Sequence, residues 1–282
     1  MKRFPLLNAS LALLMTALTS ARADNYKDAV LRDKPFAYYR LGEADNTAPV
    51  ADETGKNPGT FQNSPTAGEP GAIASDSENK SVSFARSQAQ FIQLTEFGKF
   101  GSSMTHGFTV EYWLKAANFS DHQTIFGTAN GPGFITDFLS DIAYTNHTKL
   151  LRMYIRDNHE DRYEAEFYPG GRNINIYDSA WHHIVQVYTP KTGGANNKVQ
   201  FYVDGIRQTI TLEHKGAARG NPVFSDFNRP LSLGSMNLRG TQQDPLDGSL
   251  DEVAFYTSVL SPEQIIAHYR ASGAGDHLRV PR

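Results

Sequence analysis

Apolar and polar residues alternate in short runs along most of the chain, and clusters of Gly, Asn, Asp and Pro separate the runs. This period-two pattern is typical of β-strands that bury one face. The expected strands are residues 36–41, 82–84, 90–94, 108–115, 123–127, 150–156, 162–168, 183–188, 199–203, 207–212, 231–234 and 250–256. Strands in this number with turn signals between them predict an all-β fold, an antiparallel two-sheet jelly-roll sandwich.

One tight hairpin is predicted at Asp204 and Gly205, which separate two alternating runs. Both residues tolerate positive φ, so this dipeptide favours the primed turn that joins two paired strands. Val199, Phe201 and Val203 should then share a face, and we expect that face to point into the core.

A longer hairpin is predicted for residues 150–156 and 162–168, around the loop 157–161. On one polar face this pairing sets three residues of the first strand beside three of the second: Arg152, Tyr154 and Arg156 beside Glu166, Glu164 and Arg162. Opposite charges across a ladder stabilise it by a few tenths of a kcal/mol each, up to ~1 kcal/mol. The face is either plain solvent surface or a surface that contacts sugar.

One short helix is predicted at the C-terminal end. Ser261 fits the N-cap, Pro262 the first helical position, and Gln264 completes a capping box. Gly273 should stop the helix, and we expect residues 273–282 to form a flexible tail. The folded unit is therefore expected to cover residues 24–272.

Residues 1–23 differ from the rest of the chain. They begin with Lys2 and Arg3, continue with an apolar stretch, and end in Ala21-Arg22-Ala23. This arrangement is typical of a secretory signal peptide, so we expect an exported protein, periplasmic or extracellular. No later stretch is long and apolar enough to predict a membrane span.

Charge and cysteine content exclude several classes of function. The predicted signal peptide contains three of the 27 basic residues and none of the 30 acidic ones, so residues 24–282 carry a formal charge of −6. Such a chain lacks the basic footprint of a nucleic-acid-binding protein. It has no cysteine, which excludes thiolate metal sites and thiol catalysis.

Several segments together resemble the laminin-G-like jelly roll of the concanavalin A-like lectin/glucanase superfamily. They are Ala37-Tyr-Tyr-Arg-Leu-Gly-Glu43, Phe108-Thr-Val-Glu-Tyr-Trp113, Trp181-His-His-Ile184 and Gly248-Ser-Leu-Asp-Glu-Val-Ala-Phe-Tyr256. The resemblance implies two packed antiparallel sheets, often a calcium ion, and binding of carbohydrate or protein more often than catalysis. Where the family often has Phe-Asp-Gly, this chain has Phe84-Ala-Arg86.

Two acidic pairs are candidates for catalysis. Asp251 and Glu252 are neighbours on a predicted strand and should point to opposite faces, Asp251 with Val253 and Phe255. They should therefore not act as one acid/base pair. Glu164 and Glu166 share a face about 7 Å apart along the strand, but neighbouring arginines should pair with them and keep both ionised.

Calcium binding is the metal chemistry that the sequence favours. The loop at residues 43–57 is dense in the oxygen ligands that Ca²⁺ takes. The resemblance implies that this loop lies near the last strand, so the expected ligands of a structural calcium ion are Asp52 and Asp251, then Glu43, Glu53 and Asn57. The alternative is that Asp52 caps a turn and Asp251 accepts backbone N–H bonds.

A sugar site needs aromatic faces and a few fixed hydrogen-bonding groups. By elimination of core positions, the candidates are Tyr154, Arg156, His159, Arg162, Tyr168 and Tyr177. Exposed tyrosines are also common on sandwiches without any ligand.

Three functions remain open at this point. The first is a secreted, non-catalytic, lectin-like module that recognises a glycan or a cell-surface protein and contains a structural calcium ion. The second is a polysaccharide-degrading hydrolase or lyase on the same scaffold. The third is an adhesion or structural protein of the envelope. The sequence does not predict the oligomeric state.

Overall fold

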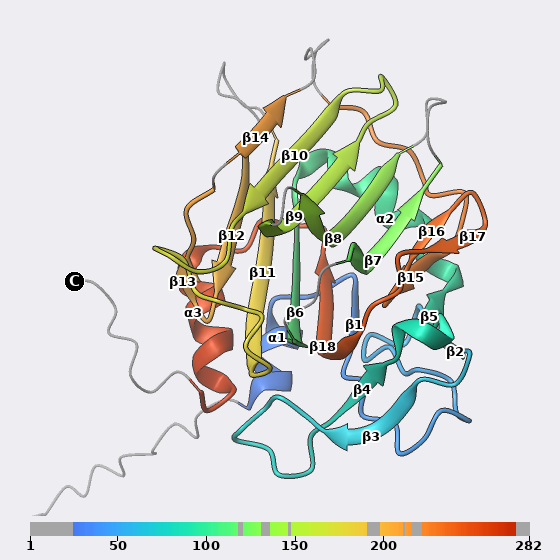
Figure 1. The fold of residues 1–282 in the computed structure, drawn as a ribbon, viewed down its shortest axis with the longest axis vertical. Helices are drawn as coiled ribbons and strands as arrows, with labels where there is room; N and C mark the ends of the chain where they lie inside the picture. The colour runs from blue at the N-terminus through green and yellow to red at the C-terminus, as the bar shows by residue number, and fades with distance from the viewer. Residues whose placement is uncertain are drawn as a thin grey trace, which may run out of the picture.

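The computed structural model describes residues 25–117, 121–130, 136–145, 148–190, 198–210, 212–215 and 222–274. The predicted signal peptide lies outside these residues, as does most of the predicted tail. The described residues form two β-sheets that pack face to face (Figure 1). The predicted all-β sandwich is confirmed.

The first sheet, here called the helix-covered sheet, has helices on its outer face. Its order is β13 (Ile206–Arg207), β12 (Lys198–Val203), β11 (Trp181–Thr189), β6 (Phe108–Ala116), β18 (Gly248–Tyr256), β4 (Lys80–Phe84) and β3 (Thr66–Pro70), and β1 (Ala37–Tyr39) also pairs with β18. All of these pairs are antiparallel.

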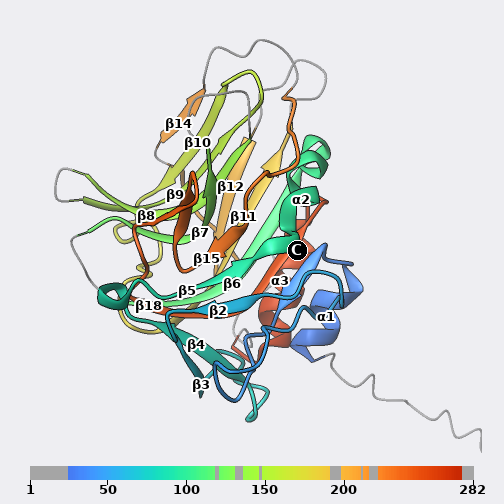
Figure 2. The ribbon, with the colours of Figure 1, turned by 90° about the vertical axis from the view of Figure 1, so that its right-hand side faces the viewer.

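The second sheet, here called the open sheet, has no helix over the outer face of β7–β10 in the described part of the chain (Figure 2). Its order is β14 (Leu212–Lys215), β10 (Arg162–Phe167), β9 (Thr148–Arg156), β8 (Asp137–Thr145), β7 (Gln123–Ala129), β15 (Leu231–Leu233), β5 (Phe91–Leu94) and β2 (Thr60–Gln62). A hairpin of β16 (Met236–Leu238) and β17 (Thr241–Gln243) joins it, with β16 parallel to β7. Strand β8 was not predicted from the sequence.

The main core lies between the two sheets. Phe108, Val110 and Phe255 of the helix-covered sheet meet Phe126 and Phe138 of the open sheet, and all five are fully buried. Aromatic rings contact one another across the layers, as Phe138 and Phe255 do with centroids 6.4 Å apart. Side chains on the opposite faces of the same strands are therefore free for other roles.

Both predicted hairpins are present. Asp204 and Gly205 have φ of 52° and 74° and join β12 to β13, with Val203 opposite Ile206. In the second hairpin the predicted register is confirmed at every polar position, because Arg156 faces Arg162, Tyr154 faces Glu164 and Arg152 faces Glu166. This register places the polar face of the hairpin on the outside of the open sheet.

The C-terminal helix α3 (Pro262–Ala271) begins as predicted. The Ser261 side chain accepts a hydrogen bond from the Gln264 N–H, and the Gln264 side chain accepts one from the Ser261 N–H. Two further helices were not predicted, α1 (Tyr26–Arg32) and α2 (Gly98–Ser103). Asn25 caps α1 by accepting a bond from the Asp28 N–H.

Helices α1 and α3 cover the outer face of the helix-covered sheet. A second apolar cluster lies beneath them, in which Tyr26 and Val30 of α1 and Ile265 and Tyr269 of α3 surround Trp113 of β6. Burial of aromatic and aliphatic side chains stabilises by roughly 1.5–3 kcal/mol each. Tertiary packing therefore holds the seven-residue helix α1, which is too short to be stable alone.

A buried polar network lies under the same two helices; we call it the covered network. Glu111 of β6 accepts hydrogen bonds from Tyr256 (2.8 Å) and His268 (2.9 Å), and the other ring nitrogen of His268 lies 2.9 Å from Asp33. Burial alone would raise the pKa of Glu111, but His268 and His183 more than offset it and hold that pKa well below its usual range. The network therefore joins the chain after α1, the helix α3 and the sheet.

Candidate functional site

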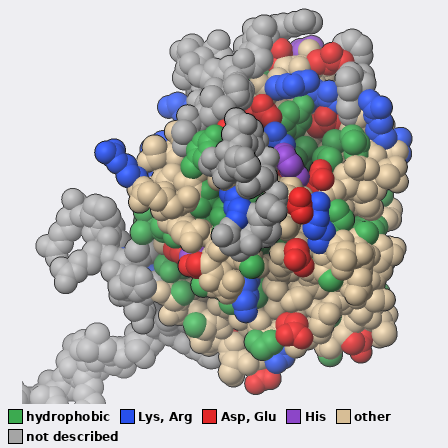
Figure 3. All heavy atoms as spheres, viewed as in Figure 1, with side chains coloured by type: hydrophobic (Ala, Val, Ile, Leu, Met, Phe, Trp, Pro, Cys, Tyr) green, Lys and Arg blue, Asp and Glu red, His purple; other side chains and the backbone are tan. Residues whose placement is uncertain are grey.

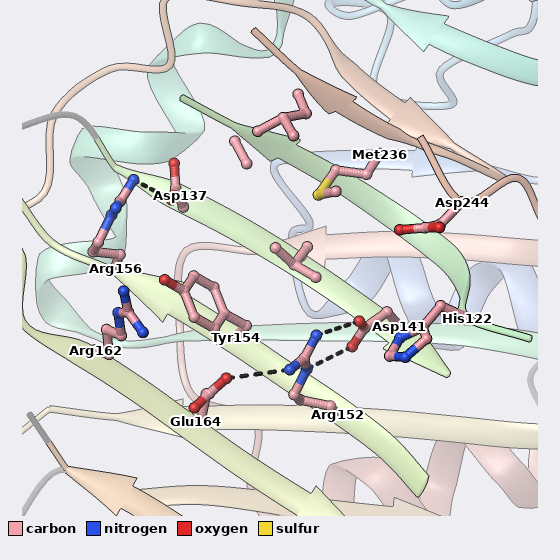
Figure 4. A pocket seen from close by; sticks show the side chains of 13 residues that line it. His122, Asp137, Asp141, Arg152, Tyr154, Arg156, Arg162, Glu164, Met236 and Asp244 are labelled. Carbon is pink, nitrogen blue, oxygen red and sulfur yellow. Dashed lines mark hydrogen bonds and ion pairs between the residues drawn. The ribbon is translucent and has the colours of Figure 1, made fainter. Parts of the chain in front are cut away.

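A cleft of about 380 Å³ lies on the outer face of the open sheet. Strands β8, β9 and β10 form its floor, and the β16–β17 hairpin stands along one side (Figure 4). Its lining residues are His122, Ala129, Asp137, Leu139, Asp141, Arg152, Tyr154, Arg156, Arg162, Glu164, Met236, Leu238 and Asp244. In the space-filling view of this side, acidic and basic side chains lie intermixed (Figure 3).

Alternation along β9 places Tyr154 in this cleft. Leu151, Met153 and Ile155 point into the core, so Tyr154 points outward with its neighbours on either side. Its side chain is partly buried, and burial raises its pKa, although the guanidinium groups of Arg162 and Arg156 act in the opposite direction. Figure 4 shows its hydroxyl directed toward these two arginines.

Arg152 is held by two carboxylates. Its Nε and Nη2 donate to Asp141 at 2.9 and 2.5 Å, and its Nη1 lies 3.3 Å from Glu164. The guanidinium carbon also lies 6.0 Å from the centroid of the Tyr154 ring. Burial raises the pKa of Asp141 and outweighs the opposing effect of Arg152. Bidentate pairing of this kind fixes the planes of both groups.

Arg156 and Arg162 lie side by side at one end of the cleft. They are directly opposite each other in the β9–β10 ladder. Arg156 is buried and forms an ion pair with Asp137. Arg162 is exposed and has no ion pair or hydrogen bond with any residue that the structure describes. One of the two guanidinium groups therefore remains available.

The structure separates the six residues predicted to bind sugar. Tyr154, Arg156 and Arg162 line the cleft together. His159 lies in the β9–β10 loop and Tyr168 just beyond β10, both outside the lining. Tyr177 is only 8% exposed and packs in the main core, so it offers no ring face to a ligand and we remove it from the site.

The other lining residues were not predicted from the sequence. Asp137 and Asp141 lie on the unpredicted strand β8, and Asp244 and Met236 reach the cleft from the β16–β17 region. The alternation of Asp137, Leu139 and Asp141 with the core residue Phe138 was the signal for β8. No local pattern indicated that the β16–β17 hairpin would stand beside β7.

The acidic pair Glu164 and Glu166 is divided in the structure, because Glu164 lines the cleft and Glu166 does not. Glu164 pairs with Arg152, as the expected charge ladder requires. Arg156, which was also expected to pair with these glutamates, pairs instead with Asp137. Asp141 is therefore a second carboxylate that pairs with the same guanidinium as Glu164.

Asp251 and Glu252 do not point to opposite faces, which corrects the sequence prediction. Glu252 has a φ of 51°, and the register between β18 and β6 shifts between Asp251 and Ala254, which is a β-bulge. Val253 and Phe255 point into the main core without Asp251, and both acids point to the outer side beside Asn79.

The two acids are fully buried and hydrogen-bonded within the fold. Asp251 accepts from the Ala72 N–H at 2.8 Å, while Glu252 accepts from Tyr38 and lies 3.1 Å from Arg40. Burial raises the pKa of both, that of Glu252 to about 7. They line none of the described clefts. This position fits a structural role better than a catalytic one.

The residues predicted to bind calcium occupy several environments. Both oxygens of Asp52 accept hydrogen bonds, among them those from the N–H groups of Tyr38, Thr54 and Asn57. Burial alone would raise the pKa of Asp52, but these bonds lower it. Glu53 forms an ion pair with Lys27 at 2.6 Å. Asp52 thus closes a turn, as in the alternative interpretation.

Two of these carboxylates keep an oxygen without a partner. They are Glu43, through Oε2, and Asp251, through Oδ1, and both atoms are buried among the described residues. The Asn57 amide donates to Phe36 O at 3.3 Å. Within the described residues, three metal-ligating side chains come together only at Asp157, His159 and Asp161, where Asp157 already accepts two backbone N–H bonds.

The profile of the concanavalin A-like lectin/glucanases superfamily (Laminin_G_3) matches residues 86–266. The chain belongs to this superfamily. The resemblance found in the sequence is therefore confirmed, and the match covers the strands from β5 to β18, including those that line the cleft, while β1 to β4 precede it. No curated protein matches the chain.

Among solved structures, domain 4 of the arabinanase AbnA from Geobacillus stearothermophilus, in complex with arabinotriose, has a TM-score of 0.52 and 20% identity, covering 82% of this chain and 96% of that one. The binding domain of botulinum neurotoxin DC, in complex with rat synaptotagmin II, has a TM-score of 0.53 and 11% identity. The match covers 85% of this chain and 52% of that one. The binding domain of botulinum neurotoxin serotype C1 has a TM-score of 0.53 and 11% identity, covering 86% of this chain and 53% of that one.

The chain thus spans nearly all of the arabinanase domain and about half of the neurotoxin domains. At these identities the likeness shows the fold alone. None of the helices in the described residues has the length and apolar composition that crossing a membrane requires.

Proposed function

We propose that this protein is an exported, non-catalytic carbohydrate-binding module, and that the cleft on the open sheet holds the sugar. The observation that carries the proposal is Tyr154, a partly buried aromatic ring in a cleft of about 380 Å³, surrounded by ion-paired polar side chains. Sugar sites combine an aromatic surface with a few fixed hydrogen-bonding groups.

The rigidity of the polar groups supports the proposal. Arg152 and Arg156 are each fixed by a carboxylate, so the planes of both guanidinium groups are set before a ligand arrives. A preorganised site loses less free energy on binding, because fewer side chains must be ordered. The arabinanase domain, whose structure contains arabinotriose, has the same fold.

The test is a glycan array followed by titration of the best ligand against Tyr154→Ala. Loss of the aromatic surface should weaken binding about tenfold, which is about 1.4 kcal/mol. Tyr168→Ala is the matched control, because Tyr168 lies outside the cleft lining. Equal affinity in the wild type and in Tyr154→Ala would contradict the proposal, as would loss in Tyr168→Ala alone.

Catalysis by a hydrolase or lyase is the second candidate, because Asp141 and Glu164 face each other across Arg152. Glycosidases use two carboxyl groups on either side of one bond. Here the carboxylates of Asp141 and Glu164 both form ion pairs with Arg152. An ion pair with a guanidinium favours the ionised form of a carboxylate, so this arrangement favours a ligand-binding role over proton transfer in catalysis. Release of oligosaccharide products that stops in Glu164→Gln would establish the enzyme; binding without product release supports the module.

A structural calcium ion remains part of the proposal. The free buried oxygens of Glu43 and Asp251 support it, since Ca²⁺ takes carboxylate oxygens as ligands. An ion that binds only the folded state stabilises it by mass action. Exhaustive chelation should therefore lower the melting temperature by several degrees, and calcium should restore it. An unchanged melting curve would count against the ion.

Export rests on residues 1–23 and is tested by the mature N-terminus. Cleavage after Ala23 would leave Asp24 as the first residue of the protein recovered from the periplasm or the medium. The third hypothesis, an envelope adhesion or structural protein, predicts pull-down of a cell-surface protein without glycan binding.

A further inference from the structure

The charged groups of the cleft are not all neutralised. Arg152 pairs with Asp141 and Glu164, and Arg156 pairs with Asp137. Arg162 and Asp244 are left, because neither side chain forms an ion pair or a hydrogen bond with the residues that the structure describes. The cleft therefore has one unpaired cation and one unpaired anion.

These two groups lie at opposite ends of the cleft, with Tyr154 between them (Figure 4). Arg162 is beside Arg156, and Arg156 forms its ion pair with Asp137. Asp244 lies near Asp141 and His122, and its charge contributes to the raised pKa of Asp141. One end is thus cationic and the other is rich in carboxylates.

We infer that the cleft takes a saccharide that carries a carboxylate, with this carboxylate on Arg162 and the sugar hydroxyls toward Asp244. The inference rests on the proposed function and adds the ligand class and its direction. A guanidinium presents a planar fork of N–H donors that matches a carboxylate, and the Asp244 carboxylate accepts hydrogen bonds from sugar hydroxyls.

The same charges exclude a strongly anionic ligand. Four carboxylates line the cleft, those of Asp137, Asp141, Glu164 and Asp244. A phosphate-rich polymer would place several negative charges against them, which is unfavourable at short range in a partly buried site. A single carboxylate at the Arg162 end avoids this repulsion, and the rest of the ligand is an uncharged polyol.

The experiment uses two matched pairs of probes, so that the carboxylate is the changed feature. A disaccharide of one hexuronate and one neutral sugar is compared with its methyl ester, and sialyllactose with its own methyl ester, by titration calorimetry. The wild type should bind the acidic member of at least one pair about tenfold more tightly. This preference should shrink in 0.5 M salt, because the pairing at Arg162 is partly exposed to solvent.

Arg162→Gln should bring the ratio of the two affinities close to one, whereas Arg162→Lys should keep part of the preference. Arg207→Gln is the control for surface charge, because Arg207 is exposed on β13 of the other sheet.

The pair of probes that shows the preference identifies the source of the carboxylate, hexuronate or sialate. Equal binding of both members of both pairs, or an unchanged preference in Arg162→Gln, would overturn the inference alone. Absence of binding by all four probes and by the array would overturn the proposed function with it.

Discussion

Both sheets have charged side chains on their outer faces, yet the two sets differ in their surroundings. On the helix-covered sheet, α1 and α3 close over Glu111, His268 and Asp33, and the side chains of the covered network satisfy one another. On the open sheet, the ion pairs of Arg152 and Arg156 surround a cleft that solvent and ligands can reach. Buried charges alone therefore do not indicate a binding site. A binding site also needs a cleft that a ligand can enter and a charged group in it without a partner within the fold.

The largest expected effect is on the covered network. Glu111→Gln removes the charge between Tyr256 and His268, and should lower the free energy of unfolding by roughly 3–5 kcal/mol, because it leaves an uncompensated buried group. Glu164→Gln in the cleft should cost about 1 kcal/mol or less, since its pair with Arg152 is partly solvated. Urea unfolding measures both. Similar losses in the two variants would break the comparison.

A smaller effect is expected at the bulge of β18. Tyr38→Phe removes the hydroxyl that donates to Glu252 and should cost about 1–3 kcal/mol, the range for a buried polar group that loses its partner. Tyr39→Phe is the matched control, because its hydroxyl donates to the neutral carbonyl of Asn57 at 2.7 Å, and about 1 kcal/mol is expected. Thermal unfolding of the two variants side by side measures the difference, and a larger loss in Tyr39→Phe would contradict it.

The smallest expected effect is a change of stability with pH. Burial raises the pKa of Glu252 to about 7, so the folded state keeps a proton that the unfolded chain loses near 4.5. Burial alone would favour neutral His268, but Glu111 and Asp33 more than offset it and raise its pKa above 6.5. Both groups bind more protons in the folded state, so stability should fall as pH rises from 6 to 8, by on the order of 1 kcal/mol.

Glu252→Gln isolates the contribution of Glu252 to this pH dependence. The variant lacks the Glu252 carboxyl, so its stability curve should be flatter between pH 6 and 8 and keep only the slopes due to His268 and to Asp251, whose pKa burial also raises. Urea unfolding at fixed pH steps gives the curves. A wild-type protein that gains stability between pH 6 and 8 would contradict the assignment.

Local patterns predicted the elements whose conformation depends on near neighbours. The Asp204-Gly205 turn, the register around residues 157–161 and the capping box of Ser261 and Gln264 were all found as expected. In each case, a few adjacent residues determine the backbone, so the sequence contains the whole signal.

Features that depend on tertiary contacts were not predicted. The bulge needs a glutamate at positive φ, a conformation that costs a side chain energy unless its surroundings compensate, as Tyr38, Arg40 and Asn79 do here. Helix α1 is stable because it packs on Trp113. The far side of the cleft comes from β8 and the β16–β17 hairpin, so only half of the site was visible in the β9–β10 pattern.

The position of α1 beside α3 has a practical consequence. The first and last described residues adjoin these two helices, and Figure 2 shows both helices on the side of the molecule away from β8–β10. A support, label or neighbouring domain joined at either of these ends would therefore leave the cleft facing outward. Immobilising the protein through one end for surface-based measurement should keep its ligand-facing side accessible.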